Sequence, residues 1–249
     1  RHHTNVLALI TPGFVLVMGL IMLGRDLGTT AVFAAILAGL LWVSGVSGKI
    51  FGGVIASVFS LIAIAIATAP YRAQRFLVVL DPFAPEDYKY AGWQPAHSLL
   101  GLASGGLFGV GLGGSRQKWG NLAEAHTDFI FPMVGEELGL KFTTLTVAAY
   151  LCICLCGALV AINAKDRFGM LLGFGSVVMI TLQAAVNIGV TTSLLPNKGM
   201  PLPFISYGGS NLCICMLLIG LIVNIHLQGK PFESLSAPTL LRPHIEPRA

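Results

Sequence analysis

Long apolar runs, each about as long as a membrane-spanning helix, dominate the chain. A helix needs roughly 20 mostly apolar residues to cross ~30 Å of hydrocarbon, and backbone groups in lipid must bond within their own segment. The runs do not alternate as the strands of a membrane barrel do. We therefore predict an all-α polytopic membrane protein with six transmembrane helices, at Val6–Leu23, Thr29–Val46, Ile50–Ala69, Phe142–Ile162, Phe168–Ile188 and Asn211–Ile225.

A long polar segment, Pro70–Lys141, separates the third and fourth apolar runs, and its own apolar pieces are short and rich in glycine. Long ordered connections tend to be functional, so we expect this segment to form an extramembrane cap of short helices that is partly re-entrant. Residues 1–229 then make a single membrane domain. Residues 230–249 are rich in Pro and Ser and are expected to form a disordered cytoplasmic tail.

Positive charges near the ends of the apolar runs predict the orientation, because lysine and arginine in short loops favour the cytoplasmic side. With a cytoplasmic N-terminus, the short outer connections carry only Arg25 and Lys198. The inner side then carries five such residues: Arg1, Lys49, Lys165, Arg167 and Lys230. This balance predicts that both ends of the chain lie inside and that the cap lies outside.

The composition supports a membrane environment. Hydrophobic residues make up 55% of the 249 residues and charged residues 10%, whereas a soluble domain carries about 25% charged residues. The net charge of +4 is too small to indicate a nucleic-acid partner. The five cysteines lie in apolar runs without metal or redox spacing. The chain opens at Arg1 without an initiating Met, so we expect its start to be a fragment boundary or that of a truncated gene model.

Three polar, glycine-containing motifs break the apolar pattern in ways that helix packing does not explain. The first is Gly24–Thr30, between the first two runs. The second begins at Gly105–Lys118 and continues through Glu124-Ala-His-Thr-Asp-Phe-Ile-Phe131 to Gly135-Glu-Glu-Leu-Gly139. The third is Leu195–Ser210, just before the last run.

In these motifs the chain closely resembles the SEDS family (FtsW/RodA/SpoVE) of bacterial cell-wall polymerases. The motifs occur in the family's order, and smaller matches lie at Pro70-Tyr-Arg72 with Arg75 and at Gln94 with Ser98. The resemblance covers about Arg1 to Gln228. The family has ten spans, so the chain is similar to spans five to ten. Glu-Ala-His-Thr-Asp and Leu-Pro-Asn-Lys-Gly resemble the division branch, FtsW, more than the elongation branch.

The resemblance implies a peptidoglycan glycosyltransferase that polymerises lipid II during cell division at the bacterial cytoplasmic membrane. A sugar hydroxyl attacks the anomeric carbon of a glycan on undecaprenyl pyrophosphate, and the lipid pyrophosphate leaves. The resemblance also implies partners, namely a class B penicillin-binding protein and other division membrane proteins. Such chemistry needs a base, positive charge for the pyrophosphate and an apolar groove for the prenyl tail.

Asp128 matches the family's catalytic aspartate and is our candidate general base. Apolar neighbours from Phe129 to Phe131 predict a pKa above the reference value of about 3.9. Pro132 is best tolerated in the first turn of a helix, so we expect a helix that starts near Pro132 and leaves Asp128 just outside its N-terminal end. A helix-capping or salt-bridging Asp128 is the structural alternative.

Nine further polar residues are candidates for substrate binding. Arginine suits bidentate phosphate contacts and lysine acts as a point charge, although cations can also lie at lipid headgroups. His126 has a structural alternative, Glu137 can pair with Lys141 at i,i+4, and Ser206 belongs to a motif that also suits a helix start. A divalent cation, Mg²⁺ or Mn²⁺, would offset pyrophosphate charge, although the sequence shows no dedicated metal cage. The nine candidates are Arg72, Arg75, Gln94, Arg116, Lys118, Glu124, His126, Lys198 and Ser206.

Two other function classes compete with the polymerase. A lipid II flippase should carry essential charges along the membrane interior, whereas the only charges between Phe142 and Ile188 lie in the Asn163–Arg167 loop. A scaffold that only recruits partners does not need the polar motifs of the cap. The pattern therefore favours the enzyme, with the flippase as the alternative.

Overall fold

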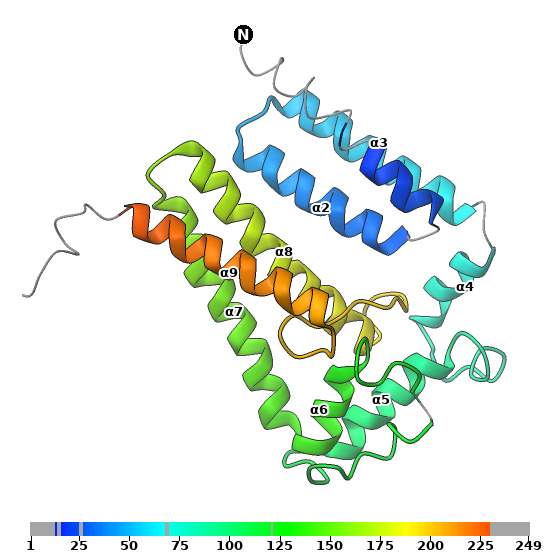
Figure 1. Cartoon of the computed structure of the whole chain (residues 1–249). Helices are drawn as coiled ribbons and strands as arrows, with labels where there is room; N and C mark the ends of the chain where they lie inside the picture. The colour runs from blue at the N-terminus through cyan, green and yellow to red at the C-terminus, as the bar shows by residue number, and fades with distance from the viewer. Residues whose placement is uncertain (1–12, 14–15, 25–26, 68–69, 121, 230–249) are drawn as a thin grey trace, which may run out of the picture.

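The computed structural model describes residues 13, 16–24, 27–67, 70–120 and 122–229. Every regular element in these residues is a helix, which confirms the predicted all-α class for the part of the chain described. In chain order the named helices are α2 (Leu27–Val43), α3 (Gly48–Ala67), α4 (Pro70–Val78), α5 (Trp93–Gly105), α6 (Ile130–Leu138), α7 (Leu140–Ile162), α8 (Arg167–Thr191) and α9 (Gly209–Gly229) (Figure 1).

Three helices, α7, α8 and α9, are long and apolar enough to cross a membrane, and α2 and α3 contain shorter apolar helices. Of the predicted span Val6–Leu23, the structure describes Gly13 and residues 16–23, and the latter are helical. The count of six spans therefore stays a prediction. Arg25, Asp26 and the predicted tail, residues 230–249, lie outside the described residues.

Helix α8 is the centre of the bundle, because it packs against α7, α9 and α2. Small residues allow these helices to approach closely, as is common in membranes. A Cβ on Gly173 would lie 3.2 Å from the Cβ of Ala161 on α7 and 3.3 Å from Ile225 on α9. The three long apolar helices thus form one closely packed core.

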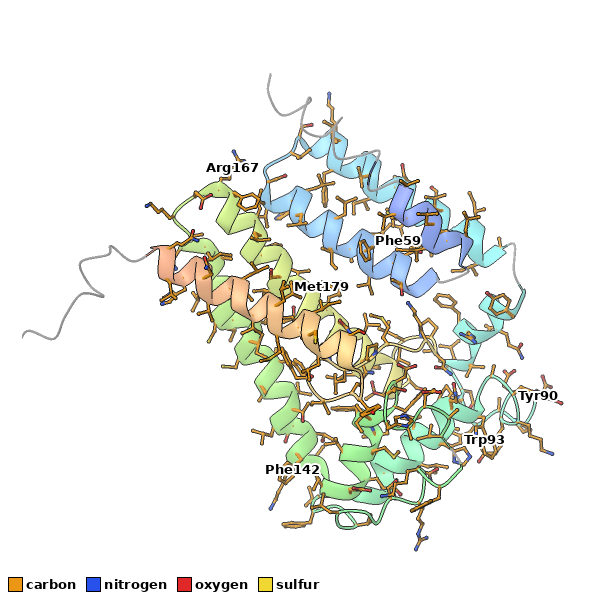
Figure 2. All side chains as sticks on the ribbon, in the orientation of Figure 1. Phe59, Tyr90, Trp93, Phe142, Arg167 and Met179 are labelled. Carbon is orange, nitrogen blue, oxygen red and sulfur yellow. The ribbon has the colours of Figure 1, made fainter. Side chains whose placement is uncertain are left out.

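The cap lies at one end of this core (Figure 1), where α5 packs against α6. Gly105 makes the approach possible, because a Cβ there would collide with the carbonyl oxygen of Gly135. Helix α6 begins at Ile130 and carries Pro132 in its first turn, which confirms the predicted start and leaves Asp128 outside the helix. Figure 2 shows Trp93 at the cap end of the molecule and Arg167 at the opposite end.

Candidate functional site

Asp128 lies in a tight turn next to a buried apolar cluster. The backbone N–H groups of Thr127, Asp128 and Phe129 all donate to the carbonyl oxygen of Glu124, at 3.1, 3.1 and 3.2 Å. Glu124 has a φ of 56°, an uncommon left-handed conformation for a side-chain-bearing residue. Phe129 is buried in a cluster with Leu122, Ala125 and Met133. The turn is therefore fixed at its apolar end and leaves the Asp128 side chain half-buried.

The loop between α8 and α9, residues 192–208, packs directly against this turn. A Cβ on Gly199 would collide with Oδ2 of Asp128, so only glycine leaves room for the carboxylate. Ser206 Oγ donates to the carbonyl oxygen of Thr127 at 2.5 Å, and the backbone N–H of Tyr207 donates to that of His126 at 3.0 Å. The second and third sequence motifs thus meet at Asp128.

Three effects set the charge state of Asp128. Burial, the largest, raises the pKa of its carboxyl group, and the negative charge of Glu124 raises it further. The positive charge of Lys198 lowers the pKa but does not cancel the other two effects. Asp128 therefore holds a proton more tightly than an exposed aspartate, as the apolar neighbours predicted.

Cationic and amide groups gather beside the same loop. Lys198 Nζ donates to Oγ1 of Thr29 on α2 at 2.6 Å. Arg75 Nη1 on α4 donates to the carbonyl oxygen of Asn197 at 3.1 Å, and Asn197 Nδ2 donates to Oε1 of Gln94 on α5 at 2.7 Å. Two of the predicted binding residues, Arg75 and Gln94, therefore bond to Asn197, which directly precedes a third, Lys198.

A cavity of about 320 Å³ opens next to this cluster. Its polar residues are Tyr71, Arg75, Asn197 and Lys198, and most of the remaining lining is aliphatic, from Ala31, Val32, Ala35, Ile66, Leu182, Val186, Val190 and Leu195. An apolar cavity with a few converging polar groups is typical of a ligand site. The combination suits an amphiphile with an anionic head and a hydrocarbon tail.

A second cavity, of about 710 Å³, lies among α5, α6, α7 and α8 and brings no charged side chain to its lining. Leu102, Phe131, Val147 and Ile188 are among its walls, and its polar side chains are the hydroxyls of Thr143, Thr144 and Thr192. Its chemistry suits hydrocarbon but offers nothing to an anionic head.

The structure places Arg116 and Lys118 on the two glutamates of α6. Lys118 Nζ donates to Oε1 of Glu137 at 2.8 Å, and the backbone N–H of Arg116 donates to the buried carboxylate of Glu136 at 2.9 Å. The glycine run also binds the Glu137 carboxylate, since the N–H of Gly113 donates to Oε2 of Glu137 at 3.0 Å. A backbone donor of the glycine run therefore holds a carboxylate of the protein itself.

The suggested i,i+4 pair of Glu137 with Lys141 is wrong. Glu137 pairs with Lys118, and Nζ of Lys141 lies 3.8 Å from the ring centroid of Phe108. The glycine run allows Glu137 to pair with Lys118, because its turns bring residues 113–118 back over α6. The pair across the loop replaces the pair along the helix.

Replacement of Glu137 by Gln should destabilise the cap at neutral pH by about 1–2 kcal/mol. Burial alone would raise the pKa of Glu137, but hydrogen bonds from Lys118, Gly113 and Ser115 outweigh burial and hold the pKa below its usual value. A lowered pKa stabilises the fold above the unfolded-state value of about 4.3, and this contribution is lost as pH falls through the folded-state value. Thermal unfolding of both proteins across pH measures the difference, with Glu86→Gln at an exposed cap position as the control. An unchanged midpoint at pH 7 would contradict this role.

The remaining predicted residues are less engaged with the centre of the site. His126 is exposed, and its ring centroid lies 5.9 Å from that of Tyr207. Arg72 lies in α4, but its side chain is outside what the structure describes. Sequence analysis missed Asn187, which donates from Nδ2 to the carbonyl oxygens of Asp128 and Met200. A signal was present, because Gln183 and Asn187 are polar residues one turn apart in an apolar helix.

The fold and the site together define a multi-pass helical membrane protein with a carboxylate and a cationic loop where its helices meet the cap. The family model FTSW_RODA_SPOVE, described as "Cell cycle protein", matches residues 1–230. The chain therefore belongs to the FtsW/RodA/SpoVE family of bacterial membrane proteins, as its motifs predicted.

Individual relatives agree with this assignment. The chain is 37% identical over 218 residues to a probable peptidoglycan glycosyltransferase FtsW of Geobacter metallireducens, an alignment that covers 87% of this chain and 58% of the relative. It is 41% identical over 208 residues to the protein of the same name from Taylorella equigenitalis, covering 82% and 57%. The chain thus spans a little over half the length of these relatives.

A solved structure shares the fold. One chain of a peptidoglycan synthase complex, described as coordinating polymerization and crosslinking, superimposes with a TM-score of 0.70 at 24% identity. The match covers 92% of this chain and 64% of that chain. At this identity the likeness establishes the helical arrangement alone.

Proposed function

We propose that the full-length protein is a peptidoglycan glycosyltransferase that polymerises lipid II on the outer face of the cytoplasmic membrane during cell division, with Asp128 as general base. The observation that carries the proposal is the contact between Asp128 and the Lys198-bearing loop beside a cavity suited to an anionic amphiphile. The relatives' name, probable peptidoglycan glycosyltransferase FtsW, supports the coarser assignment to glycosyl transfer in peptidoglycan synthesis.

In the proposed reaction the Asp128 carboxylate takes the proton of an acceptor sugar hydroxyl while the hydroxyl oxygen forms a bond to the anomeric carbon of the donor. The bond from that carbon to the pyrophosphate oxygen breaks, and its electron pair leaves with the lipid pyrophosphate. A positioned base typically contributes about 10²–10⁴-fold in rate. Its raised pKa makes Asp128 a better proton acceptor than an exposed aspartate.

Lys198 and Arg75 are proposed to offset the negative charge that grows on the leaving pyrophosphate. Both line the smaller cavity, whose aliphatic walls would hold the first part of the prenyl chain. No group of three His, Cys, Asp or Glu side chains gathers among the described residues. Asp128 and Glu124 alone do not form a metal cage, so the divalent cation stays a prediction.

A class B penicillin-binding protein is the proposed partner, because new glycan strands must be cross-linked. The fold shared with a chain of a peptidoglycan synthase complex supports an assembly of this kind. The partner belongs in any test of activity.

The test is polymerisation of fluorescent lipid II in vesicles by the full-length protein with its penicillin-binding partner, followed by separation of glycan products by size. The proposal predicts glycan strands that require the protein. Transfer of lipid II across the bilayer with no strands under any condition would instead establish the flippase alternative.

A further inference from the structure

We propose that Asn187 is the positioning residue that fixes the base Asp128 and the cation-bearing loop to each other. Asn187 lies on α8, in the spanning core, and not in either motif. Its Nδ2 donates one hydrogen bond to the carbonyl oxygen of Asp128 at 2.8 Å and another to that of Met200 at 2.5 Å. One amide hydrogen therefore bonds to the motif that contains Asp128, and the other bonds to the motif that contains Met200. The inference rests on the proposed function of Asp128.

The burial of Asn187 shows that these two bonds decide its orientation. Its side chain is 2% exposed, and a polar side chain inside an apolar spanning helix is costly unless it is bonded. Among the described residues, Oδ1 of Asn187 has no hydrogen-bond partner. The Nδ2 group thus donates to both carbonyl oxygens, while Oδ1 accepts no hydrogen bond from the described part of the chain and stays unsatisfied.

The bond to Met200 also fixes the neighbouring residues of that loop. Gly199, which touches the Asp128 carboxylate, precedes Met200, and Lys198 precedes Gly199. A single rigid amide consequently holds the backbone of the base and, two residues away, the backbone of the proposed pyrophosphate cation. Asn187 thus adds a link from α8 to the direct bonds that Ser206 and Tyr207 make between the turn and the loop.

Two neighbouring positions of α8 also bond to segments that pack at this end of the helix. Gln183, one turn earlier, donates from Nε2 to the carbonyl oxygen of Pro201 at 2.9 Å. One turn later, the carbonyl oxygen of Thr191 accepts a bond from Ser98 Oγ of α5 at 2.5 Å. Only Asn187 in this series bonds to both the Asp128 turn and the α8–α9 loop, so it is the member expected to control catalytic geometry.

Two substitutions test the inference in the full-length protein, with lipid II as the probe. Asn187→Leu keeps the branched shape and the same number of non-hydrogen side-chain atoms, and it removes both donors. Asn187→Gln keeps the amide but moves it by one methylene group. Because a displacement of about 1 Å in an active site can cost 10²-fold in rate, we expect kcat to fall about 100-fold for Leu and about 10-fold for Gln. The KM for lipid II should stay within about threefold, since most of the aliphatic cavity wall lies on α2 and α8, outside the loop that Asn187 holds.

Ser98→Ala is the matched control, because it also removes one buried hydrogen bond to α8 but touches neither motif. It should lower the melting temperature about as much as Asn187→Gln, with kcat within about twofold of wild type. The inference is overturned if either folded Asn187 variant keeps a kcat as high as Ser98→Ala, or if KM rises as much as kcat falls. If Asp128→Asn keeps the wild-type rate, the proposed function itself fails. If Asp128→Asn is inactive and the Asn187 variants match the control, only the positioning role fails.

Discussion

Asp128→Asn lowers the rate of lipid II polymerisation at neutral pH by about 10²–10⁴-fold, the usual contribution of a positioned base. The amide has nearly the shape of the carboxylate but cannot take a proton from the acceptor hydroxyl. The backbone bonds that hold the turn, from Asn187 to the Asp128 carbonyl oxygen and from the 127–129 amides to Glu124, do not involve the substituted atoms. We therefore expect the variant to fold and to bind lipid II.

Asp87→Asn is the matched control, because Asp87 also lies in the cap and accepts a side-chain hydrogen bond, from Gln74 Nε2 at 2.6 Å, that an asparagine oxygen can also accept. Its polymerisation rate should equal that of the wild type. Initial rates from labelled lipid II, with lipid binding measured on the same preparations, separate loss of chemistry from loss of binding. Unchanged polymerisation by Asp128→Asn would remove Asp128 from the reaction.

Gly199→Ala lowers kcat by about 100-fold with little change in melting temperature. The new Cβ collides with Oδ2 of Asp128. The carboxylate is the movable end of a side chain, so it swings away instead of disrupting the fold. A base displaced by about 1 Å loses this order of rate. Steady-state polymerisation kinetics and thermal unfolding of the purified variant measure the two effects.

Gly209→Ala serves as the control for this substitution, because a Cβ at Gly209 has no atom within 4 Å and the residue lies in the first turn of α9. Its kcat and stability should match the wild type. Full activity of Gly199→Ala would show that the carboxylate does not need the observed position. A large fall in melting temperature would assign the loss to unfolding.

Much of the helical framework could be predicted from local sequence. The apolar runs locate α7, α8 and α9 to within a few residues, and Pro132 locates the start of α6. The ends of the runs are less informative, because helices continue past the apolar stretch where the cap binds them. Helix α8 extends to Thr191, three residues beyond the predicted end, where its carbonyl group accepts a bond from Ser98.

Only those site residues that are polar or charged and lie within a recognisable motif could be predicted from the sequence. Asp128 and Lys198 were identified in separate motifs, and the structure joins them through Gly199. Sequence could not show that Lys118 would be neutralised by Glu137, because that pair depends on how the glycine run folds back over α6. The polar position of Asn187 was visible in the sequence, but its two partners were not, since they lie 59 and 13 residues away in the chain.

The pH dependence of kcat in the wild type and in Glu124→Gln tests the central claim most directly. Activity should fall as pH decreases through the pKa of Asp128, which burial and Glu124 raise above the reference value near 3.9. Removal of the Glu124 charge lowers that pKa, so the acidic loss of activity should move to lower pH. An acidic limb at the same pH in both proteins would contradict the assignment of Asp128 as the base.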